Sequence, residues 1–241
     1  MRTAVISDIH GNLEALNQVL EDIAQAQIDF LICLGDCIGY GPEPEEVVQA
    51  LRSRAIPCIL GNHELGLLDP SYRKWFNPPT RTSLRLTRKL LSAASLNYFK
   101  ELPPFAVHRN CRYVHGFPPD SVTTYLYEVP EAEIQRLLTA LPERICFIGH
   151  THDLHLIAVQ AGGIEYRPAS RGIVFLEADK KYLINSGSVG QPRDGTNHAK
   201  YVIWDDEAST LEIRFVAYDI ARTAEKILSL GFPAYNAERL W

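Results

Sequence analysis

Aspartate, asparagine and histidine recur in five short clusters, and these residue types bind transition metals through carboxylate, amide and imidazole groups. Each cluster directly follows an apolar, strand-like run. The clusters are Asp8-Ile9-His10, Gly35-Asp36, Gly61-Asn62-His63-Glu64, His115-Gly116 and Gly149-His150-Thr151-His152. This arrangement predicts a dinuclear metal site.

Strand geometry explains how clusters that are distant in sequence can meet. Ligands of open α/β sheets bind beyond the carboxyl ends of the strands, so the clusters converge if their strands are parallel neighbours. Asp8 and His10 are two residues apart, as are His150 and His152, and on an extended chain each pair faces one side. We therefore expect each pair to bind one metal centre together. The apolar runs that precede the clusters are 3–7, 30–34, 56–60, 112–114 and 145–148.

The first half of the chain alternates between strand and helix patterns. Residues 12–27 carry an apolar stripe at helical spacing, and 43–54 form a second helix pattern between the strand-like runs 30–34 and 56–60. This β-α-β-α-β order predicts a parallel sheet with right-handed crossovers.

The second half is rich in strand patterns, which predicts a second, partly antiparallel sheet. A helix is expected at 130–140 and another at 220–230, where Gly231 and Pro233 end it. Strands are expected at 145–148, 154–159, 173–177, 181–184, 199–205 and 210–217.

Between the two halves lies a segment without clear periodicity. Residues 65–82 are expected to form a loop or lid, followed by a helix over 83–99 and a hairpin of 103–107 with 111–114 that delivers His115. Trp75, Phe76 or Arg81 then either overhangs the site or packs on the surface.

Composition narrows the class of protein. A chain of 241 residues with 46% hydrophobic content predicts one α/β domain over residues 1–241. The net charge of −5 argues against a dedicated duplex nucleic-acid or anionic-membrane surface and favours a small anionic substrate. With no apolar stretch of about 20 residues and no signal-peptide pattern, we expect a cytoplasmic protein. A homodimer is one option for an oligomeric state that the sequence leaves open.

The cysteines agree with a cytoplasmic location. The five cysteines are odd in number and form no CxxC pair, so a disulfide framework is not expected. Cys37, next to Asp36, either packs in the core or approaches a soft metal.

In their order, the five clusters resemble the motif set of the calcineurin-like metallophosphoesterases, particularly their small bacterial and archaeal phosphodiesterase-like branch. The resemblance covers residues 8–152 and extends through 185–193. It implies a four-layer αββα sandwich of two facing mixed β-sheets, with the metals at the carboxyl ends of strands.

The resemblance also implies seven metal ligands and two divalent transition-metal ions. Imidazole, carboxylate and amide donors suit Mn, Fe, Zn, Co or Ni, and the sequence does not choose among them. By position, one metal takes Asp8, His10 and His152, the other takes Asn62, His115 and His150, and Asp36 bridges the two.

For this family the expected reaction is in-line attack at phosphorus by a metal-bridging hydroxide. His63 is then expected to protonate the leaving oxygen or to stabilise charge, the alternative being a packing residue beside a ligand. Most relatives carry Asp where this chain has Glu64, and that carboxylate is expected to orient His63. The late loop also departs from the family, because Ser186 replaces a proline in Asn185-Ser186-Gly187-Ser188.

Substrate contacts are expected from two places. Arg193 offers a fork of donors to phosphate, together with backbone amides of 187–190, or else Arg193 is solvated or paired with Asp194. Tyr40 either lines the entrance to the site or packs the loop.

These features predict a metal-dependent phosphoric ester hydrolase, either a phosphodiesterase or a nucleotide phosphohydrolase, with a small phosphorylated substrate and nucleotides among the candidates. The alternatives are a serine/threonine-type protein phosphatase or phosphomonoesterase of the same superfamily, and a non-catalytic metal-binding interaction scaffold. A nuclease is disfavoured because nothing in the sequence indicates a groove for a nucleic-acid strand.

Overall fold

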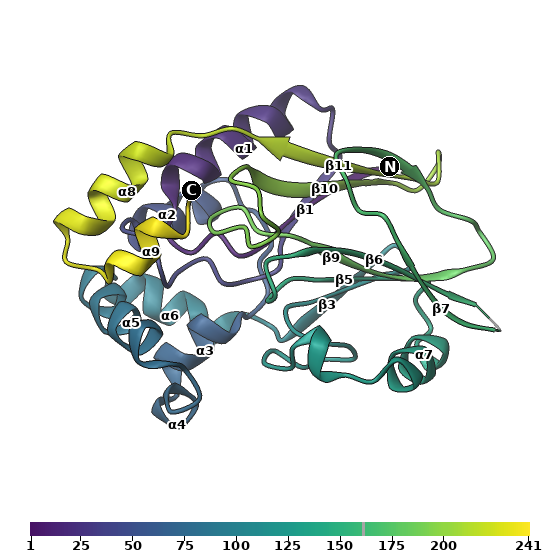
Figure 1. Cartoon of the computed structure of the whole chain (residues 1–241), viewed down its shortest axis with the longest axis horizontal. Coiled ribbons are helices and arrows are strands. Elements are labelled where there is room, and N and C mark those ends of the chain that lie inside the picture. Colours follow the sequence, from purple (N-terminus) through teal and green to yellow (C-terminus); the bar gives the residue numbers. More distant parts are fainter. Residues whose placement is uncertain (161) are drawn as a thin grey trace.

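Two mixed β-sheets face each other and carry helices on their outer sides (Figure 1). The computed structural model describes residues 1–160 and 162–241. The first sheet has the order β2-β1-β10-β11-β8. Its strands are β1 (Arg2–Ile6), β2 (Phe30–Cys33), β8 (Gly172–Phe175), β10 (Ala199–Asp205) and β11 (Thr210–Val216).

The second sheet has the order β3-β4-β5-β9-β6-β7. Its central strands β4, β5 and β9 are parallel, as are β1 and β2 in the first sheet. The strands are β3 (Phe105–His108), β4 (Cys111–Val114), β5 (Ile145–Ile148), β6 (Leu154–Gln160), β7 (Gly163–Arg167) and β9 (Lys181–Ser186).

Alternation along the strands separates three apolar layers. On β1, Ala4 and Ile6 pack towards the helices, whereas Val5 packs between the sheets. On β5, Phe147 lies between the sheets while Ile148 packs against helix α7 (Glu131–Ala140). The predicted αββα sandwich is thereby confirmed.

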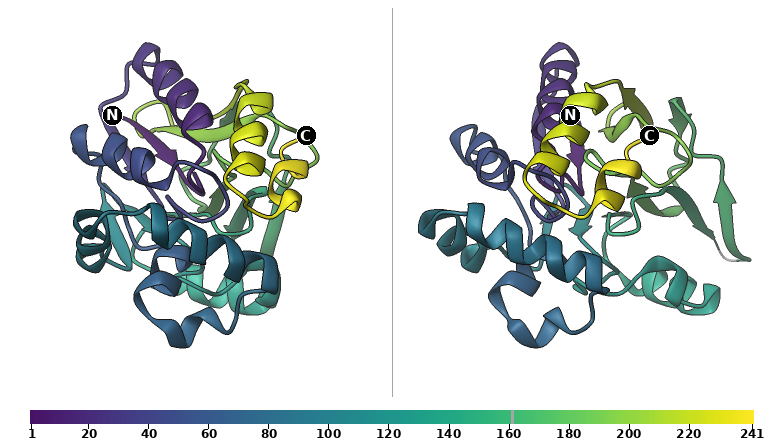
Figure 2. Two further views of the ribbon diagram at one scale, coloured as in Figure 1. Left: turned by 90° about the vertical axis from the view of Figure 1, so that its left-hand side faces the viewer. Right: turned by 60° about the vertical axis from the view of Figure 1, so that its left-hand side comes forward.

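Helices α1 (Leu13–Gln25) and α2 (Pro44–Ser53) cover the first sheet, close to their predicted positions. Helix α8 (Ile220–Ser229) and the short α9 (Ala234–Glu238) lie beside α1 and α5 (Pro78–Leu90) (Figure 2). Helix α9 and strand β7 are absent from the predicted elements. Among the described residues, no helix has both the length and the hydropathy needed to cross a membrane.

The prediction of a loop over 65–82 is wrong, because most of this segment is helical. It contains the end of α3 (Asn62–Leu68), all of α4 (Pro70–Arg73) and the start of α5 (Pro78–Leu90). Pro70 and Pro78 each begin a helix, after Asp69 and Asn77, whose side chains accept hydrogen bonds from the first turn. These prolines therefore start helices within a segment that lacks a clear helical periodicity.

The expected helix over 83–99 is instead split in two. Leu91 has an extended backbone, and Ser92 caps a new helix, α6 (Ala93–Glu101), by accepting a hydrogen bond from the backbone N–H of Ser95 at 3.1 Å.

The expected strand over 56–60 is reduced to one bridge, between Cys33 and Cys58. Pro57 lacks an N–H and so cannot continue the ladder as a donor. The segment stays extended and still leads to Asn62. The hairpin of β3 and β4 forms as predicted.

Candidate metal centre

The five clusters meet in one place, beyond the carboxyl ends of β1, β2, β4 and β5 and at the start of α3. The parallel strands of both sheets end there, which is why residues far apart in sequence become neighbours. Each side chain is at most 6% exposed, namely Asp8, His10, Asp36, Asn62, His115, His150 and His152.

Five of these residues have a left-handed backbone. Their φ angles lie between 50° and 69°, a region that side chains other than glycine rarely adopt. Such backbone strain concentrates at functional sites, where the surrounding structure holds it in place. The residues are Asp8, His10, Asp36, His150 and His152.

The first group of donors contains Asp8, His10 and His152. The Nε2 atoms of the two histidines are 2.9 Å apart, and Asp8 Oδ1 lies 3.3 Å from His152 Nε2 and 3.7 Å from His10 Nε2. Among the described residues, buried Asp8 Oδ1 has no hydrogen-bond partner. Three donor atoms that converge without satisfying one another fit a cation.

The second group is centred on Asp36. Its Oδ2 lies 3.4 Å from His115 Nε2 and 3.6 Å from His10 Nε2, so the carboxylate stands between the two groups. Asn62 Oδ1 lies 3.0 Å from His115 Nε2, and donor atoms of Asp36, His115 and His150 lie within 4.8 Å of one another.

The hydrogen bonds of the histidine rings to backbone carbonyls show which ring nitrogen faces the centre. Nδ1 of His10 donates to Ile38 O at 2.9 Å, and Nδ1 of His115 donates to Leu34 O at 2.9 Å. Nε2 of each ring therefore faces the centre, where a metal would bind it on loss of the Nε2 proton. His152 follows the same pattern with Gln191 O at 2.6 Å, whereas His150 is reversed and bonds Thr123 O through Nε2 at 3.2 Å.

The charges of this centre are strongly coupled. Burial would raise the pKa of Asp36, but the charges of His115 and His63 outweigh it and hold that pKa well below its ordinary value. Burial alone would lower the pKa of His115, yet Asp36 raises it to about 9. Burial and the charge of His115 lower the pKa of His150 to about 3. Burial and the charge of Arg193 lower the pKa of His152 to about 4.

His63 faces the same centre from the first turn of α3. Its Nε2 lies 3.9 Å from Asp36 Oδ2, and its ring packs against Gly39, Tyr40 and Phe76. Among the described residues, Nδ1 has no partner, and a protonated Nδ1 would be a buried donor without an acceptor. The ring proton is therefore best placed on Nε2, directed at the centre. Burial lowers the pKa of His63 well below its ordinary value.

Glu64 does not hold His63, contrary to expectation. Its carboxylate accepts hydrogen bonds from four backbone N–H groups, those of Asp36 (3.0 Å), Cys37 (2.8 Å), Ile38 (3.3 Å) and Gly61 (3.1 Å). A Cβ at Gly61 would overlap both Asp36 and this carboxylate, so glycine is required there. Glu64 thus fixes the loop that presents Asp36. Burial and the charge of Asp36 raise its pKa to about 8.

Glu64→Ala is expected to destabilise the protein because it leaves those backbone donors without their acceptor. Each buried unsatisfied donor costs roughly 1 to 3 kcal/mol, and water entering the gap offsets part of this, so we expect a total loss of about 3 kcal/mol or more. Urea denaturation of Glu64→Ala and Glu64→Asp measures the difference. An unfolding free energy equal to that of wild type in Glu64→Ala would contradict this role.

Arg193 and Tyr40 lie together beside the centre. The guanidinium carbon of Arg193 is 5.9 Å from the centroid of the Tyr40 ring, which is itself 4.6 Å from that of His10. Arg193 Nε is buried without a partner among the described residues, while Asp194 pairs with Lys200 at 2.8 Å. The alternative pairing of Arg193 with Asp194 is not formed. Asn236 of α9 donates to Tyr40 O at 2.9 Å and supports the loop.

The expected contact between an anion and the amides of 187–190 is wrong for at least three of them. The N–H groups of Gly187, Val189 and Gly190 donate to Asn185 Oδ1 at 3.1 Å, Ser7 O at 3.0 Å and Asp8 O at 2.9 Å. This segment therefore holds the loop after β1.

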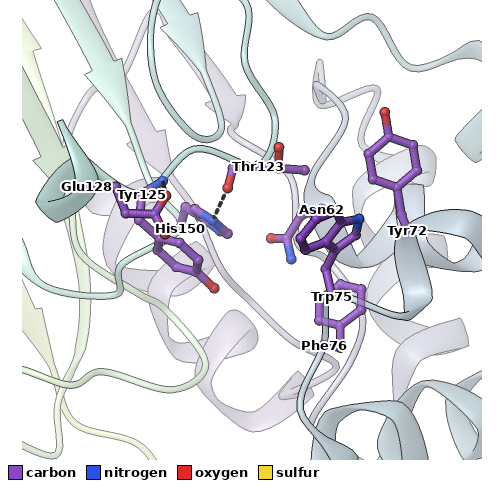
Figure 3. Close-up of a pocket in the computed structure, with 8 residues that line it drawn as sticks. All are labelled: Asn62, Tyr72, Trp75, Phe76, Thr123, Tyr125, Glu128 and His150. Atoms are coloured by element: carbon purple, nitrogen blue, oxygen red, sulfur yellow. Dashed lines mark hydrogen bonds between the residues drawn. The ribbon is translucent and has the colours of Figure 1, made fainter.

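A cleft of about 470 Å³ opens beside the centre (Figure 3). Asn62 and His150 form its inner end, and Trp75 and Phe76 form part of one wall. The remaining lining residues, Tyr72, Thr123, Tyr125 and Glu128, carry no motif and were not singled out from the sequence. Cys37, for which the sequence left open packing or an approach to a soft metal, is buried in the core. Its thiol lies with those of Cys33 and Cys58 and not with the Asp and His donors of the centre.

The family model for calcineurin-like phosphoesterases matches residues 1–154. An uncharacterized protein, MJ0912, of Methanocaldococcus jannaschii is 36% identical over 99% of this chain and 96% of its own length. The crystal structure of a metallophosphoesterase from Sphaerobacter thermophilus superposes with a TM-score of 0.82 and 31% identity, covering 100% of this chain and 98% of that one.

A further relative is a symmetrical bis(5'-nucleosyl)-tetraphosphatase of Pseudomonas putida. It is 27% identical over 57% of this chain and 50% of its own length. The family match, the full-length relatives and the buried His and Asp groups agree with one another. The chain therefore belongs to the calcineurin-like phosphoesterase family and is a metal-dependent hydrolase of phosphoric esters.

Proposed function

We propose that the chain is a dinuclear phosphodiesterase or nucleotide phosphohydrolase. The observation that carries this proposal is the position of Asp36, whose carboxylate stands between two groups of converging donors. One group is Asp8, His10 and His152; the other is Asn62, His115 and His150, and Asp36 serves both.

When bound, two divalent ions at this centre would polarise phosphoryl oxygens and lower the pKa of a water molecule. Residues of the chain supply the remaining chemistry. His63 directs its Nε2–H at the reacting phosphate; as the imidazolium, which the negative phosphate favours, it gives this proton to the leaving oxygen and keeps the proton on Nδ1. Arg193 donates to the non-reacting phosphoryl oxygens from beside Tyr40.

Two observations favour a small nucleotide substrate over a phosphoprotein. The cleft beside the centre, at about 470 Å³, has the size of a small-molecule site. A relative is named as a hydrolase of bis(5'-nucleosyl) tetraphosphates. A non-catalytic scaffold would not need His63, which is not one of the seven expected ligands and whose buried ring faces the donors.

Removing the metal is expected to abolish hydrolysis of bis(p-nitrophenyl) phosphate. Chelator-treated protein should lose about a hundredfold or more in turnover, since the ions supply several kcal/mol of charge stabilisation. Adding back Mn²⁺, Fe²⁺, Zn²⁺, Co²⁺ or Ni²⁺ singly should restore turnover and raise the thermal midpoint; we propose Mn²⁺ as the first choice. Elemental analysis of the untreated protein gives the number of ions. Turnover that survives complete chelation would reject the proposal.

A further inference from the structure

The cleft beside the metal centre has aromatic side chains on both walls (Figure 3). Tyr72, Trp75 and Phe76, from α4 and the turn after it, form one wall. Tyr125, which precedes the single helical turn Leu126–Glu128, forms the other. Among the described residues no Lys or Arg lines the cleft, and the nearest cation to its aromatic wall is Lys74, whose Nζ lies 5.5 Å from the centroid of the Trp75 ring.

On each wall, an aromatic ring contacts a histidine of the centre. The ring of Tyr125 stacks on His150 with centroids 3.7 Å apart and planes 19° apart, and Tyr127 stacks on Tyr125 at 4.9 Å. On the opposite wall, the ring of Phe76 lies 5.1 Å from that of His63. A ligand in the cleft is therefore placed directly next to a phosphate held at the centre.

Two of the aromatic rings are unusually exposed for their size. Trp75 is 79% exposed and Tyr127 is 73% exposed. Together with Tyr72, Phe76 and Tyr125 in the cleft wall they form a group of aromatic rings, and such a group supplies flat apolar area for a ligand.

We propose that this cleft holds the nucleobase of a nucleotide whose phosphate lies at the metal centre, and that Trp75 stacks on the base. This inference rests on the proposed function and names its substrate class. Stacking on an aromatic side chain suits any base, because every base has a flat π-face. The phosphate chain would then run from the cleft past His150 towards Arg193, the cation that stands over Tyr40.

Binding can be tested without turnover, through Trp75 itself. AMP added to the metal-loaded protein should quench tryptophan emission, whereas ribose 5-phosphate, which has no base, should not. In Trp75→Phe the quenching should disappear although Trp204 and Trp241 remain. Equal quenching by both ligands, or quenching by AMP that persists in Trp75→Phe, would overturn the base subsite.

A kinetic test separates the base subsite from the proposed function. Thymidine 5'-(p-nitrophenyl phosphate) and methyl p-nitrophenyl phosphate share a leaving group, but the first carries a deoxyribose and a base where the second carries a methyl group. The ratio of their kcat/KM values should favour the thymidine ester, and Trp75→Ala should lower that ratio about tenfold or more. Tyr166→Ala, which alters an exposed tyrosine on β7, should leave the ratio as in wild type.

Hydrolysis of both esters at a ratio that Trp75→Ala leaves unchanged would overturn the base subsite and leave the phosphoesterase intact. Hydrolysis of neither ester by the metal-loaded protein would overturn the proposed function, and the base subsite with it.

Discussion

Asp36→Asn is expected to lower kcat/KM for bis(p-nitrophenyl) phosphate by about a thousandfold, which corresponds to several kcal/mol of lost transition-state stabilisation. The substitution keeps the shape of the side chain. Asparagine Oδ1 can still accept the His63 backbone N–H, which Asp36 does at 2.8 Å. The change is confined to Oδ2, where a negative oxygen facing His115 and His10 becomes an N–H₂ group that donates towards them. The site thereby loses the one carboxylate that serves both groups of donors.

The same variant separates metal binding from folding. We expect the thermal midpoint of metal-free Asp36→Asn to stay near that of metal-free wild type, because the backbone hydrogen bond survives and His115 can release its proton. The rise in midpoint on adding metal should be much smaller than in wild type. Asp29→Asn, an exposed position just before β2 and at the opposite end of that strand, serves as the matched control. Full activity in Asp36→Asn would refute a bridging role for Asp36.

The sequence predicts the convergence of the clusters because the end of a parallel strand determines at which edge of the sheet the next residues lie. A polar residue directly after a buried parallel strand has to lie at the carboxyl edge of its sheet, and Asp8 and His150 follow this rule. The spacing of two places Asp8 and His10 in one group of donors, although through left-handed backbones and not through an extended chain. For His150 and His152 the expectation of one shared metal centre is wrong, because His150 lies in the second group and His152 in the first.

Other features depend on tertiary contacts that the sequence does not display. Prolines at 70 and 78 look like breakers until the capping residues Asp69 and Asn77 are recognised. Strand β7 begins at Gly163 and is half-exposed, so its apolar alternation is weak. Tyr125 reaches the site only because the chain between β4 and α7 folds back over His150, a contact that no local pattern indicates.

The contacts of Glu64 are likewise not visible in the sequence. The family resemblance implies that the carboxylate at position 64 orients His63, yet neighbouring residues on a helix point in different directions. The carboxylate turns towards the loop 36–38, and His63 is held by packing against Gly39 and Phe76. Orientation of the imidazole by shape therefore replaces orientation by a hydrogen bond.

His63→Ala is expected to slow hydrolysis by about 10² to 10⁴-fold for substrates with a poor leaving group, the range of a positioned general acid. The physical reason is the direction of the ring, whose Nε2 lies 3.9 Å from Asp36 Oδ2 and carries the proton that faces the centre. A nucleoside or alkyl oxygen leaves slowly without that proton. Nitrophenolate needs no proton, so the loss on bis(p-nitrophenyl) phosphate should be at least about tenfold smaller.

This difference between leaving groups distinguishes proton transfer from the other roles open to His63. A residue that only stabilises charge on the phosphoryl oxygens would lower both rates equally, and a residue that only packs would lower the unfolding free energy while leaving the leaving-group dependence as in wild type. His108→Ala is the matched control, because register places His108 opposite Cys111, at the far end of the hairpin from His115. A steeper dependence on the leaving group in His63→Ala alone would establish His63 as the proton donor, and equal losses on both substrates would reject that role.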